Sequence, residues 1–401
     1  MSCGELNCGE LNCGELNCGE LNCGDLNCGD LNCGDLNWAE FVSPNTGTLV
    51  RESQAPMDFA GDAIPPGVLA AWPADCQPIR SAQHRQGGFS DARIWKCTAP
   101  RGALALRAWP TEIDRERLLW IHRFQLHIAA TGRVTVAAPI ATRDHATIVD
   151  CGGRFWELAP WLAGEPLRSG ETTDAERRAA LVALADFHLA AAQFASNEPR
   201  EGAPPAALRR RVHLQNLIQT NCRIWPARLE SRGWPELAPL AHRWISHLPR
   251  MIPLIDRALR DASGMKVPLQ ACLRDIWSEH LLFQGSRVTG ILDFGAAGWD
   301  TVAGDLARLI PSLVGDDLKL RQELLASYES LRPLAPVERL LIDLLDQAAV
   351  LLGPALWFRW IAEEGREFSN RDEVVRRVAA MVERLDRLAR GSMDGGICEI
   401  C

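Results

Sequence analysis

Residues 272–309 read CLRDIWSEHLLFQGSRVTGILDFGAAGWDTVAGDLARL, and this stretch decides the fold. Two apolar runs, HLLFQG and RVTGILDFG, flank a turn at residues 285–286 and so predict a β-hairpin. Asp275 stands just before the hairpin and Asp293 just after it. Because a hairpin brings the outer ends of its strands together, the segments that carry both carboxylates should converge. Two carboxylates at one edge suit a divalent metal ion together with proton transfer.

The chain around this hairpin divides into a strand-rich part and a helical part. Within residues 77–162, short β-type runs alternate with Gly and Pro, and an amphipathic helix at 111–130 begins at Thr111 as a plausible cap. The expected strands are 77–85, 92–99, 103–110, 134–142 and 147–162. Residues 163–392 are mainly helical apart from the hairpin. The pattern predicts an α+β fold with a small antiparallel-sheet N-lobe and a larger helical C-lobe.

These motifs, in this order, resemble the aminoglycoside phosphotransferase and choline kinase group, which shares the protein-kinase-like fold. In that family an H-G-D-x-x-x-x-N segment supplies a catalytic Asp and a metal-binding Asn, and an Asp after the hairpin holds metal ions. The resemblance places Asp275 at the catalytic position, His280 at the Asn position and Asp293 at the metal position. It implies ATP-dependent phosphorylation of a hydroxyl or amine of a small molecule, with Mg²⁺ or alternatively Mn²⁺ as the metal.

The strand-rich part fits the same family. The turn GGFSD resembles the phosphate-covering turn, whose donors to phosphate would be Gly87, Gly88 and Ser90. Arg107 stands where the family has a phosphate-binding base on the third strand. The resemblance implies an acidic partner for this base on the following helix, with Glu116 as the first candidate and Glu112 as the second.

Two further stretches extend the resemblance to most of the chain, roughly residues 77–390. ELAPWLAGEPL at 157–167 resembles the hinge between the lobes, where backbone groups would hold adenine. GWDTVAGDLARL resembles the family's helix after the metal loop, and there Asp305 would brace that loop. His188 is interpreted as a packed helix residue. The acids that either face a cationic acceptor or form solvated surface are Asp300, Glu363 and Glu364.

Three positions depart from the family pattern. The base is Arg instead of Lys, in a chain with 3 Lys among 43 basic residues, and Arg keeps the charge. Leu273 replaces the His that braces the catalytic loop. His280 replaces Asn, and imidazole suits softer metals than Mg²⁺, so reduced activity or a preference for Mn²⁺ is our hypothesis. The last two departures favour the alternative of a kinase-like protein that binds a ligand or partner with little or no catalysis.

The chain also carries two segments outside the lobes. Seven units of Cys-Gly-Glu/Asp-Leu-Asn fill residues 3–37 and resemble pentapeptide repeats, which form a four-sided β-helix. Seven units make fewer than two coils of such a helix, so we interpret residues 1–37 as a flexible acidic tail in preference to a functional β-helix. Residues 38–76 are expected to be a connector. The tail at 393–401 is expected to hold Cys398 and Cys401 as free thiols, with a metal or redox role as the alternative.

Composition limits the partners. The repeats hold seven acids and no base, so outside them 44 acidic side chains face 43 basic ones, a net charge of −1. This balance favours no nucleic-acid partner. No apolar run approaches the roughly 18 residues of a membrane span, and the N-terminus has no signal pattern. The scattered cysteines are typical of a reducing compartment. We therefore expect a cytoplasmic protein that acts on a small molecule without a membrane partner, and the sequence leaves its oligomeric state open.

Overall fold

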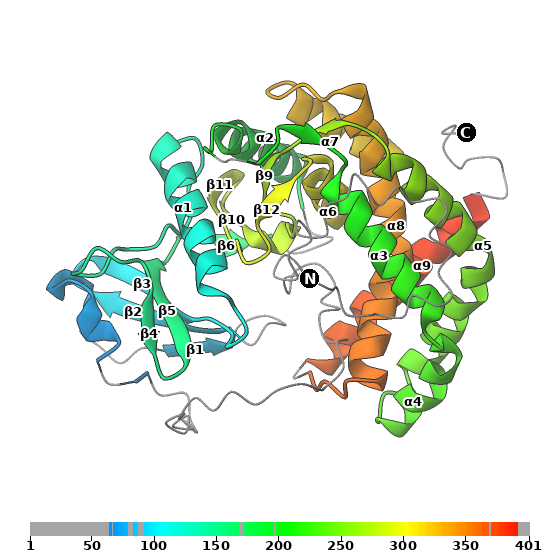
Figure 1. The fold of residues 1–401 in the computed structure, drawn as a ribbon, viewed down its shortest axis with the longest axis horizontal. Helices are drawn as coiled ribbons and strands as arrows, with labels where there is room; N and C mark the ends of the chain where they lie inside the picture. The colour runs from blue at the N-terminus through cyan, green and yellow to red at the C-terminus, as the bar shows by residue number, and fades with distance from the viewer. Residues whose placement is uncertain are drawn as a thin grey trace, which may run out of the picture.

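The computed structural model describes residues 64–65, 67–78, 83–86, 92–167, 172–195, 198–368 and 370–391. The repeats, the turn predicted to cover phosphate with Gly87, Gly88 and Ser90, and the tail with Cys398 and Cys401 lie outside these ranges. A smaller lobe that contains a sheet lies beside a larger helical lobe (Figure 1). The predicted α+β, two-lobed architecture is therefore confirmed.

Five antiparallel strands form the sheet of the smaller lobe, in the order β1-β2-β3-β5-β4. They are β1 (Gln83–Gln86), β2 (Arg93–Ala99), β3 (Gly102–Ala108), β4 (Val149–Cys151) and β5 (Arg154–Pro160). Successive side chains of a strand point to opposite faces. One face buries apolar residues such as Trp95, Leu106 and Leu158, whereas the other carries Lys96 and Arg107 toward the larger lobe.

Three of the expected strands differ from the structure. Strand β1 begins at Gln83, so Gln77 and Pro78 of the expected strand 77–85 lie outside it. The run at 134–142 does not join the sheet and makes a single bridge, from Val136 to Ile291 of the larger lobe. The run at 147–162 instead forms both β4 and β5, because Gly152 and Gly153 adopt φ of 64° and 72° and close a tight hairpin. Five strands were expected and five are present, but they are not the same five.

The smaller lobe begins before residue 77. The 3₁₀ turns η2 (Leu69–Ala71) and η3 (Ala74–Cys76) fall in the expected connector, yet Val68, Trp72 and Cys76 are buried against the sheet. The indole N–H of Trp72 donates to the carbonyl of Ile140 at 2.8 Å. This part of the expected connector is thus a piece of the lobe's hydrophobic core.

Helix α1 (Arg115–Thr131) joins the two lobes (Figure 1). Its N-cap is Asp114 and not Thr111: the Asp114 carboxylate accepts from the Arg117 amide at 2.9 Å, and Asp is a strong N-cap residue. From its buried side Phe124 reaches Phe187 of the larger lobe and Phe294, which follows Asp293, each with ring centroids 5.8 Å away. Helix α1 therefore packs directly against the predicted metal loop.

The larger lobe is built mainly from helices. They are α2 (Asp174–Ala191), α3 (Pro205–Gln219), α4 (Trp225–Ser231, after the 3₁₀ turn η4, Cys222–Ile224), α5 (Leu237–Ser263), α6 (Ala303–Val314), α7 (Leu318–Glu329), α8 (Pro336–Ala362) and α9 (Arg371–Gly391). The predicted Thr-rich start of α2 is a capping box between Thr173 and Glu176. In the described part of the chain, α8 is long and apolar enough to cross a membrane, but 67% of that window is buried. Asp346 of α8 also pairs with Arg321 and Arg384, which is typical of a core helix.

Short strands position the predicted hairpin inside this helical lobe. Strands β10 (Leu281–Gln284) and β11 (Arg287–Ile291) form the hairpin, and β6 (Glu165–Pro166) pairs with its edge. Strand β9 (Gln270–Cys272) pairs with β12 (Gly298–Asp300), so the segments before and after the hairpin are tied together. The remaining pair is β7 (Glu201–Gly202) with β8 (Val267–Pro268).

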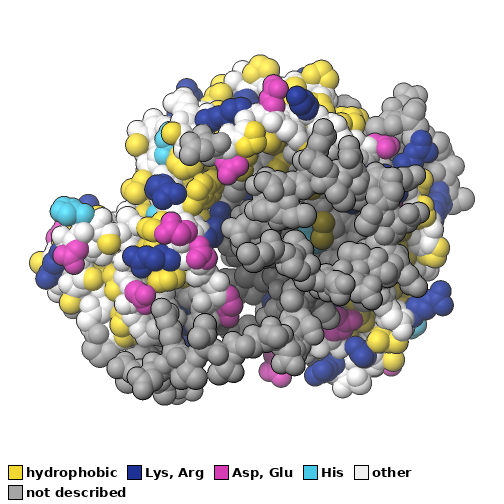
Figure 2. All heavy atoms as spheres, viewed as in Figure 1, with side chains coloured by type: hydrophobic (Ala, Val, Ile, Leu, Met, Phe, Trp, Pro, Cys, Tyr) yellow, Lys and Arg dark blue, Asp and Glu magenta, His cyan; other side chains and the backbone are white. Residues whose placement is uncertain are grey.

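The described surface carries both signs of charge. On the face shown in Figure 2, basic and acidic side chains are interspersed over the smaller lobe and do not gather in a patch of one sign. This distribution agrees with the near-neutral charge of the chain outside its repeats.

Candidate active site

A cavity of about 1690 Å³ lies between the lobes. Its walls come from β2, β3 and β5 of the smaller lobe, the hairpin region, and helices α3, α6, α8 and α9. Arg107, Asp275, His280 and Asp293, all predicted from sequence, line it together. Glu112, the second candidate partner of Arg107, also lines it, but it precedes α1 and accepts from the Thr111 hydroxyl at 2.9 Å. Segments that are far apart in the chain thus place one base, two carboxylates and one imidazole on a common cleft.

Asp275 lies in the loop between β9 and the 3₁₀ turn η5 (Ser278–His280). Its carboxylate is 16% exposed and is held from two sides through Oδ1. The indole N–H of Trp277 donates to this oxygen at 2.6 Å, and the guanidinium of Arg308 on α6 donates to it as well. Arg308 also stacks 4.4 Å from the centre of the Trp277 ring. The two partners fix the orientation of a carboxylate that borders the cleft.

His280 links the two carboxylate segments. Its Nδ1 lies 2.9 Å from the backbone carbonyl of Asp275, and because a carbonyl can only accept, Nδ1 carries the hydrogen. The other ring nitrogen, Nε2, lies 4.0 Å from Oδ2 of Asp293, so the ring faces the second carboxylate. A hydrogen bond that fixes the far ring nitrogen in this way is typical of metal-binding histidines.

Asp293 stands in a backbone conformation that few residues adopt. Its φ is 60°, and among the described residues only His145 and Arg274 are other non-glycine residues with positive φ. Arg274 immediately precedes Asp275. One carboxylate residue, Asp293, is therefore itself left-handed, and the other follows a left-handed residue. Such backbone conformations cluster at functional sites. Burial raises the pKa of Asp293, but the charges of Arg107 and His280 and the amide of Gly295 outweigh it and hold this pKa below its usual value.

Arg107 faces Asp293, and the predicted pair with Glu116 does not form in this structure. Nη2 of Arg107 lies 4.0 Å from Oδ1 of Asp293, and its guanidinium stacks 3.8 Å from the centre of the Trp109 ring. Glu116 is exposed in the first turn of α1 and does not line the cleft. The buried acid that lines the cleft beside Arg107 is Glu157 on β5.

The predicted metal loop after Asp293 is held by α1. Arg117 donates to the carbonyl of Gly295 at 3.3 Å and also to the carbonyl of Ala297. The amide of Gly295 in turn donates to Oδ1 of Asp293 at 3.1 Å. The family resemblance predicted that Asp305 braces this loop, but in the structure Arg117 does so. Nothing in the sequence around Arg117, in the first turn of α1, indicated this contact.

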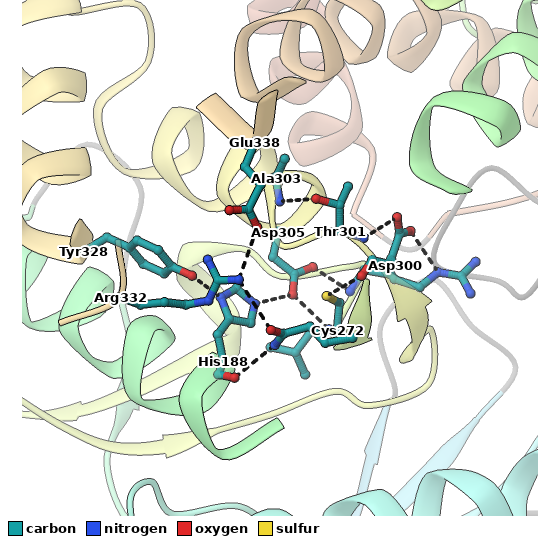
Figure 3. A network of polar contacts seen from close by, with 12 residues as sticks. His188, Cys272, Asp300, Thr301, Ala303, Asp305, Tyr328, Arg332 and Glu338 are labelled. Atoms are coloured by element: carbon teal, nitrogen blue, oxygen red, sulfur yellow. Dashed lines mark hydrogen bonds and ion pairs between the residues drawn. The ribbon is translucent and has the colours of Figure 1, made fainter. Parts of the chain in front are cut away.

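Asp305 instead braces the predicted catalytic loop before Asp275 (Figure 3). Its carboxylate accepts from the amides of Leu273 at 2.9 Å and Arg274 at 2.6 Å. It also lies 3.0 Å from Nε2 of His188, whose Nδ1 lies 2.8 Å from the hydroxyl of Tyr328. Burial lowers the pKa of His188 more than Asp305 raises it, so the neutral ring donates through Nε2 and accepts at Nδ1. The sequence predicted His188 to be a packed helix residue, and it is fully buried.

This network accounts for Leu273 at the family's His position. Leu273 contributes a buried side chain and an amide, while the imidazole comes from His188 on α2. Cys272 completes a group of three potential metal ligands with His188 and Asp305, whose ligand atoms lie within 4.8 Å of one another. Burial, followed by the charges of Asp305 and Asp300, raises the pKa of the Cys272 thiol, which therefore stays protonated. Hydrogen bonds within the fold explain this group, and it needs no metal.

Asp305→Asn should destabilise the protein. The amide cannot accept all three hydrogen bonds through one oxygen, so buried donors lose their partner, and we expect a loss of about 3 kcal/mol in the free energy of unfolding. Urea denaturation measures this loss. Asp317→Asn is the matched control, because Asp317 is an exposed N-cap of α7 where Asn serves as well, and a change below about 0.5 kcal/mol is expected. Equal losses in both variants would contradict the assigned brace.

Comparison with known proteins identifies the family. The profile described as "Phosphotransferase enzyme family" matches residues 81–341, which is more than half of the chain. The chain belongs to this phosphotransferase family. The phosphotransferase resembles homoserine kinases: that of Methylobacterium nodulans is 28% identical over 255 residues, covering 62% of this chain and 71% of the relative, and that of Brucella anthropi is 26% identical over 255 residues, covering 62% and 70%. The predicted small-molecule kinase is thereby confirmed at the level of the family.

Solved structures show the same fold for the phosphotransferase. A microcompartment-associated aminopropanol kinase has a TM-score of 0.55 at 16% identity, covering 82% of this chain and 96% of that one. An amicoumacin kinase in complex with AMP-PNP and Ca²⁺ has a TM-score of 0.54 at 10% identity, covering 76% and 88%. A second profile, "Pentapeptide repeats (8 copies)", matches residues 2–39 and confirms the resemblance of the N-terminal repeats.

Proposed function

We propose that this phosphotransferase transfers the γ-phosphoryl group of ATP to a hydroxyl or amine of a small molecule, in the cytoplasm. The observation that carries the proposal is the convergence of Asp275, His280 and Asp293 at one edge of the cleft, with Arg107 on the opposite lobe facing Asp293. Two carboxylates, an oriented imidazole and a guanidinium are the groups that phosphoryl transfer requires for positioning and charge stabilisation.

The donor set fits a divalent cation. Asp293 offers a carboxylate whose pKa is held low, and His280 offers an Nε2 lone pair directed to the same place. Asp293 and His280 would hold Mg²⁺, or Mn²⁺ as the alternative, which when bound neutralises charge on the transferring phosphate. Arg107 would contact the phosphate oxygens, and Gly87, Gly88 and Ser90 would cover them from the turn before β2.

Asp275 would orient the acceptor and receive its proton. As the new bond from the acceptor to phosphorus forms, the bond from the γ-phosphorus to the bridging oxygen breaks, and ADP leaves. Trp277 and Arg308 hold one carboxylate oxygen, Oδ1, and thereby aim the carboxylate at the acceptor. Most of the rate enhancement would come from this positioning and from the charges around the phosphate.

Small amino alcohols such as homoserine are the first acceptors to test. Several relatives are named homoserine kinase, and a structural neighbour is named aminopropanol kinase. The three acids that the sequence suggested for a cationic acceptor do not line the cleft. Asp300 is buried against Arg209, and Glu363 accepts from Trp225. Glu364 pairs with Arg359 and Arg366. The α3 wall of the cleft instead carries Arg210 and Arg209, the latter paired with Asp300, and these basic side chains suit an acceptor with a carboxylate.

ADP release measured against a panel of acceptors tests this proposal. We expect turnover above the acceptor-free rate for at least one hydroxyl or amine compound when ATP and Mg²⁺ or Mn²⁺ are present. Homoserine, aminopropanol, choline and an aminoglycoside form the panel. Acceptor-independent ADP release throughout the panel, or none at all, would favour the binding protein that Leu273 and His280 suggested.

His280→Asn should change the metal preference. Asn restores an oxygen ligand, which Mg²⁺ prefers to imidazole, so the ratio of rates with Mg²⁺ to rates with Mn²⁺ should rise by about tenfold. Rates at saturating ATP with each metal measure the ratio. His145→Asn is the control, because His145 is exposed and lies outside the cleft lining. An unchanged ratio in His280→Asn would remove His280 from the metal site.

A further inference from the structure

Arg107 and Glu157 are direct neighbours in the sheet. They are register partners across the antiparallel pair of β3 and β5, so their side chains leave the same face of the sheet. Both line the cleft. Glu157 is only 6% exposed, and a carboxylate buried to this extent requires charged or hydrogen-bonding partners. Its neighbours must therefore explain why an acid is kept at this position.

The partners of Glu157 connect it to Arg107 and to α1. The indole N–H of Trp109 donates to Oε2 of Glu157 at 2.8 Å, and the ring of the same Trp109 stacks with the Arg107 guanidinium at 3.8 Å. Nε2 of His122, a buried residue of α1, lies 2.5 Å from the same oxygen. Nδ1 of His122 lies 2.8 Å from the hydroxyl of Thr147. One carboxylate thus bonds both to Trp109, the stacking partner of the base, and to the helix that joins the lobes.

The electrostatics agree with this geometry. Burial raises the pKa of Glu157, but the hydrogen bond and charge of His122, the charge of Arg107 and the bond from Trp109 outweigh it and lower this pKa. Glu157 therefore carries a negative charge beside Arg107 at neutral pH. Within the described residues, Nε of Arg107 is buried and has no hydrogen-bond partner, so neighbouring charge and stacking set the orientation of its guanidinium.

We propose that Glu157 is the positioning residue for Arg107, in place of the α1 acid that the sequence suggested, and that His122 couples α1 to this pair. The inference rests on the proposed function, because it assumes that Arg107 binds the phosphates of ATP. Glu157 would act through Arg107 and would not touch the nucleotide. An acid on α1 would contact the base directly. Here His122 of α1 contacts Glu157 on β5, and Glu157 lies beside the base.

A double-mutant cycle on the full-length protein tests the inference. The variants are Glu157→Gln, Arg107→Met, their combination, and Glu116→Gln as the matched control with the same chemical change on α1. Titration calorimetry gives the Kd for ATP with Mg²⁺, and thermal unfolding gives Tm. Gln keeps the size of Glu157 and can accept from Trp109, so the charge is the main loss.

We expect Arg107→Met to weaken ATP binding by about thirtyfold, in line with the value of charge-assisted bonds to phosphate. Glu157→Gln should weaken it by about tenfold, because it removes the negative charge beside Arg107. The combined variant should bind no more weakly than Arg107→Met alone, and Glu116→Gln should stay within about twofold of the parent. If Glu157 had only a structural role, Glu157→Gln would lower Tm in the parent and in Arg107→Met alike. The weakening of ATP binding in the combined variant would then be the product of the two single effects.

Each other outcome overturns the inference in a distinguishable way. If the effects of Glu157→Gln and Arg107→Met multiply, Glu157 does not act through the base, although the large Arg107 effect still supports the proposed function. If Arg107→Met binds ATP normally, the assigned role of Arg107 fails as well. If Glu116→Gln weakens ATP binding by about tenfold while Glu157→Gln leaves it unchanged, the helix acid is the true partner. Should Glu157→Gln not fold, His122→Gln replaces it: an Arg107-dependent weakening of about threefold supports the inference, and no weakening overturns it.

Discussion

Asp275→Asn is expected to lower kcat by about a thousandfold while leaving the Kd for ATP within about twofold of the parent. The reason is geometric. Trp277 and Arg308 hold one oxygen of Asp275 at the edge of the cleft, and Asn keeps the size and one accepting oxygen of the side chain. The amide cannot take the proton of the acceptor, so catalysis is lost while the nucleotide site is unchanged. Steady-state rates and titration calorimetry measure the two quantities.

Asp144→Asn provides the control for this prediction. Asp144 is exposed on the smaller lobe and does not line the cleft, so its replacement should leave both kcat and the Kd for ATP unchanged. If Asp275→Asn retained kcat within about threefold, Asp275 would not be the proton acceptor, since positioned acid–base groups contribute far more than this. A parallel loss of ATP binding would place Asp275 in the nucleotide site instead.

Asp293→Asn is expected to remove the metal dependence of nucleotide binding. In the parent, Mg²⁺ should tighten ATP binding by about a hundredfold, because Asp293 would hold the cation and the cation would neutralise phosphate charge. In the variant, Kd values with and without Mg²⁺ should agree within about threefold, since a neutral amide is a much weaker ligand for a hard cation. Titration calorimetry with and without EDTA gives both values.

The environment of Asp293 makes this prediction specific. Arg107 and His280 lower its pKa, so the carboxylate is charged at neutral and mildly acidic pH, and its protonation should not limit metal binding there. Asp144→Asn is the control, because Asp144 is exposed and its replacement leaves the cleft unchanged. Asp300→Asn is unsuitable, because Asp300 accepts from two buried amides and its replacement would disturb the fold. Persistent metal dependence in Asp293→Asn would mean that another group holds the cation.

The hairpin region could be predicted from the sequence because its signals are local. Turn residues, two apolar runs and a carboxylate on either side all lie within residues 272–309, and antiparallel pairing then brings Asp275 and Asp293 together. His280 was placed by its match to the Asn position of the family motif. The backbone bond that directs its Nε2 to Asp293 requires coordinates, because it depends on how η5 turns back toward Asp275.

The partners of the site residues could not be predicted in the same way. Glu157 lies beside Arg107 because of the register of β3 and β5, and the sequence alone does not determine that register. The expectation for Glu116 relied only on its position in the family pattern. Arg308 stands three residues after Asp305 on α6, so the two lie on neighbouring parts of one helix surface, and this spacing was the one available signal. The contact between His188 and Asp305 joins α2 to α6 across 117 residues.

The expected strand at 134–142 illustrates a different difficulty. Its β-branched and apolar residues have strand character, but Pro139 lacks an amide hydrogen, and the run passes between the lobes, where Val136 bridges to Ile291. Tertiary contacts decided its structure. The Gly152–Gly153 turn was visible in the sequence and is a strong hairpin signal, so the split of 147–162 into two strands could have been predicted.

The most direct test of the proposed function is ³¹P NMR of the reaction with ATP, Mg²⁺ and the acceptor that gives the highest ADP release. With the parent protein we expect the γ-phosphate signal of ATP to be replaced by ADP signals and a new phosphoester or phosphoramide signal, and with Asp275→Asn we expect no such product over the same period. ADP together with free phosphate alone, or equal product from both proteins, would contradict acceptor phosphorylation through Asp275.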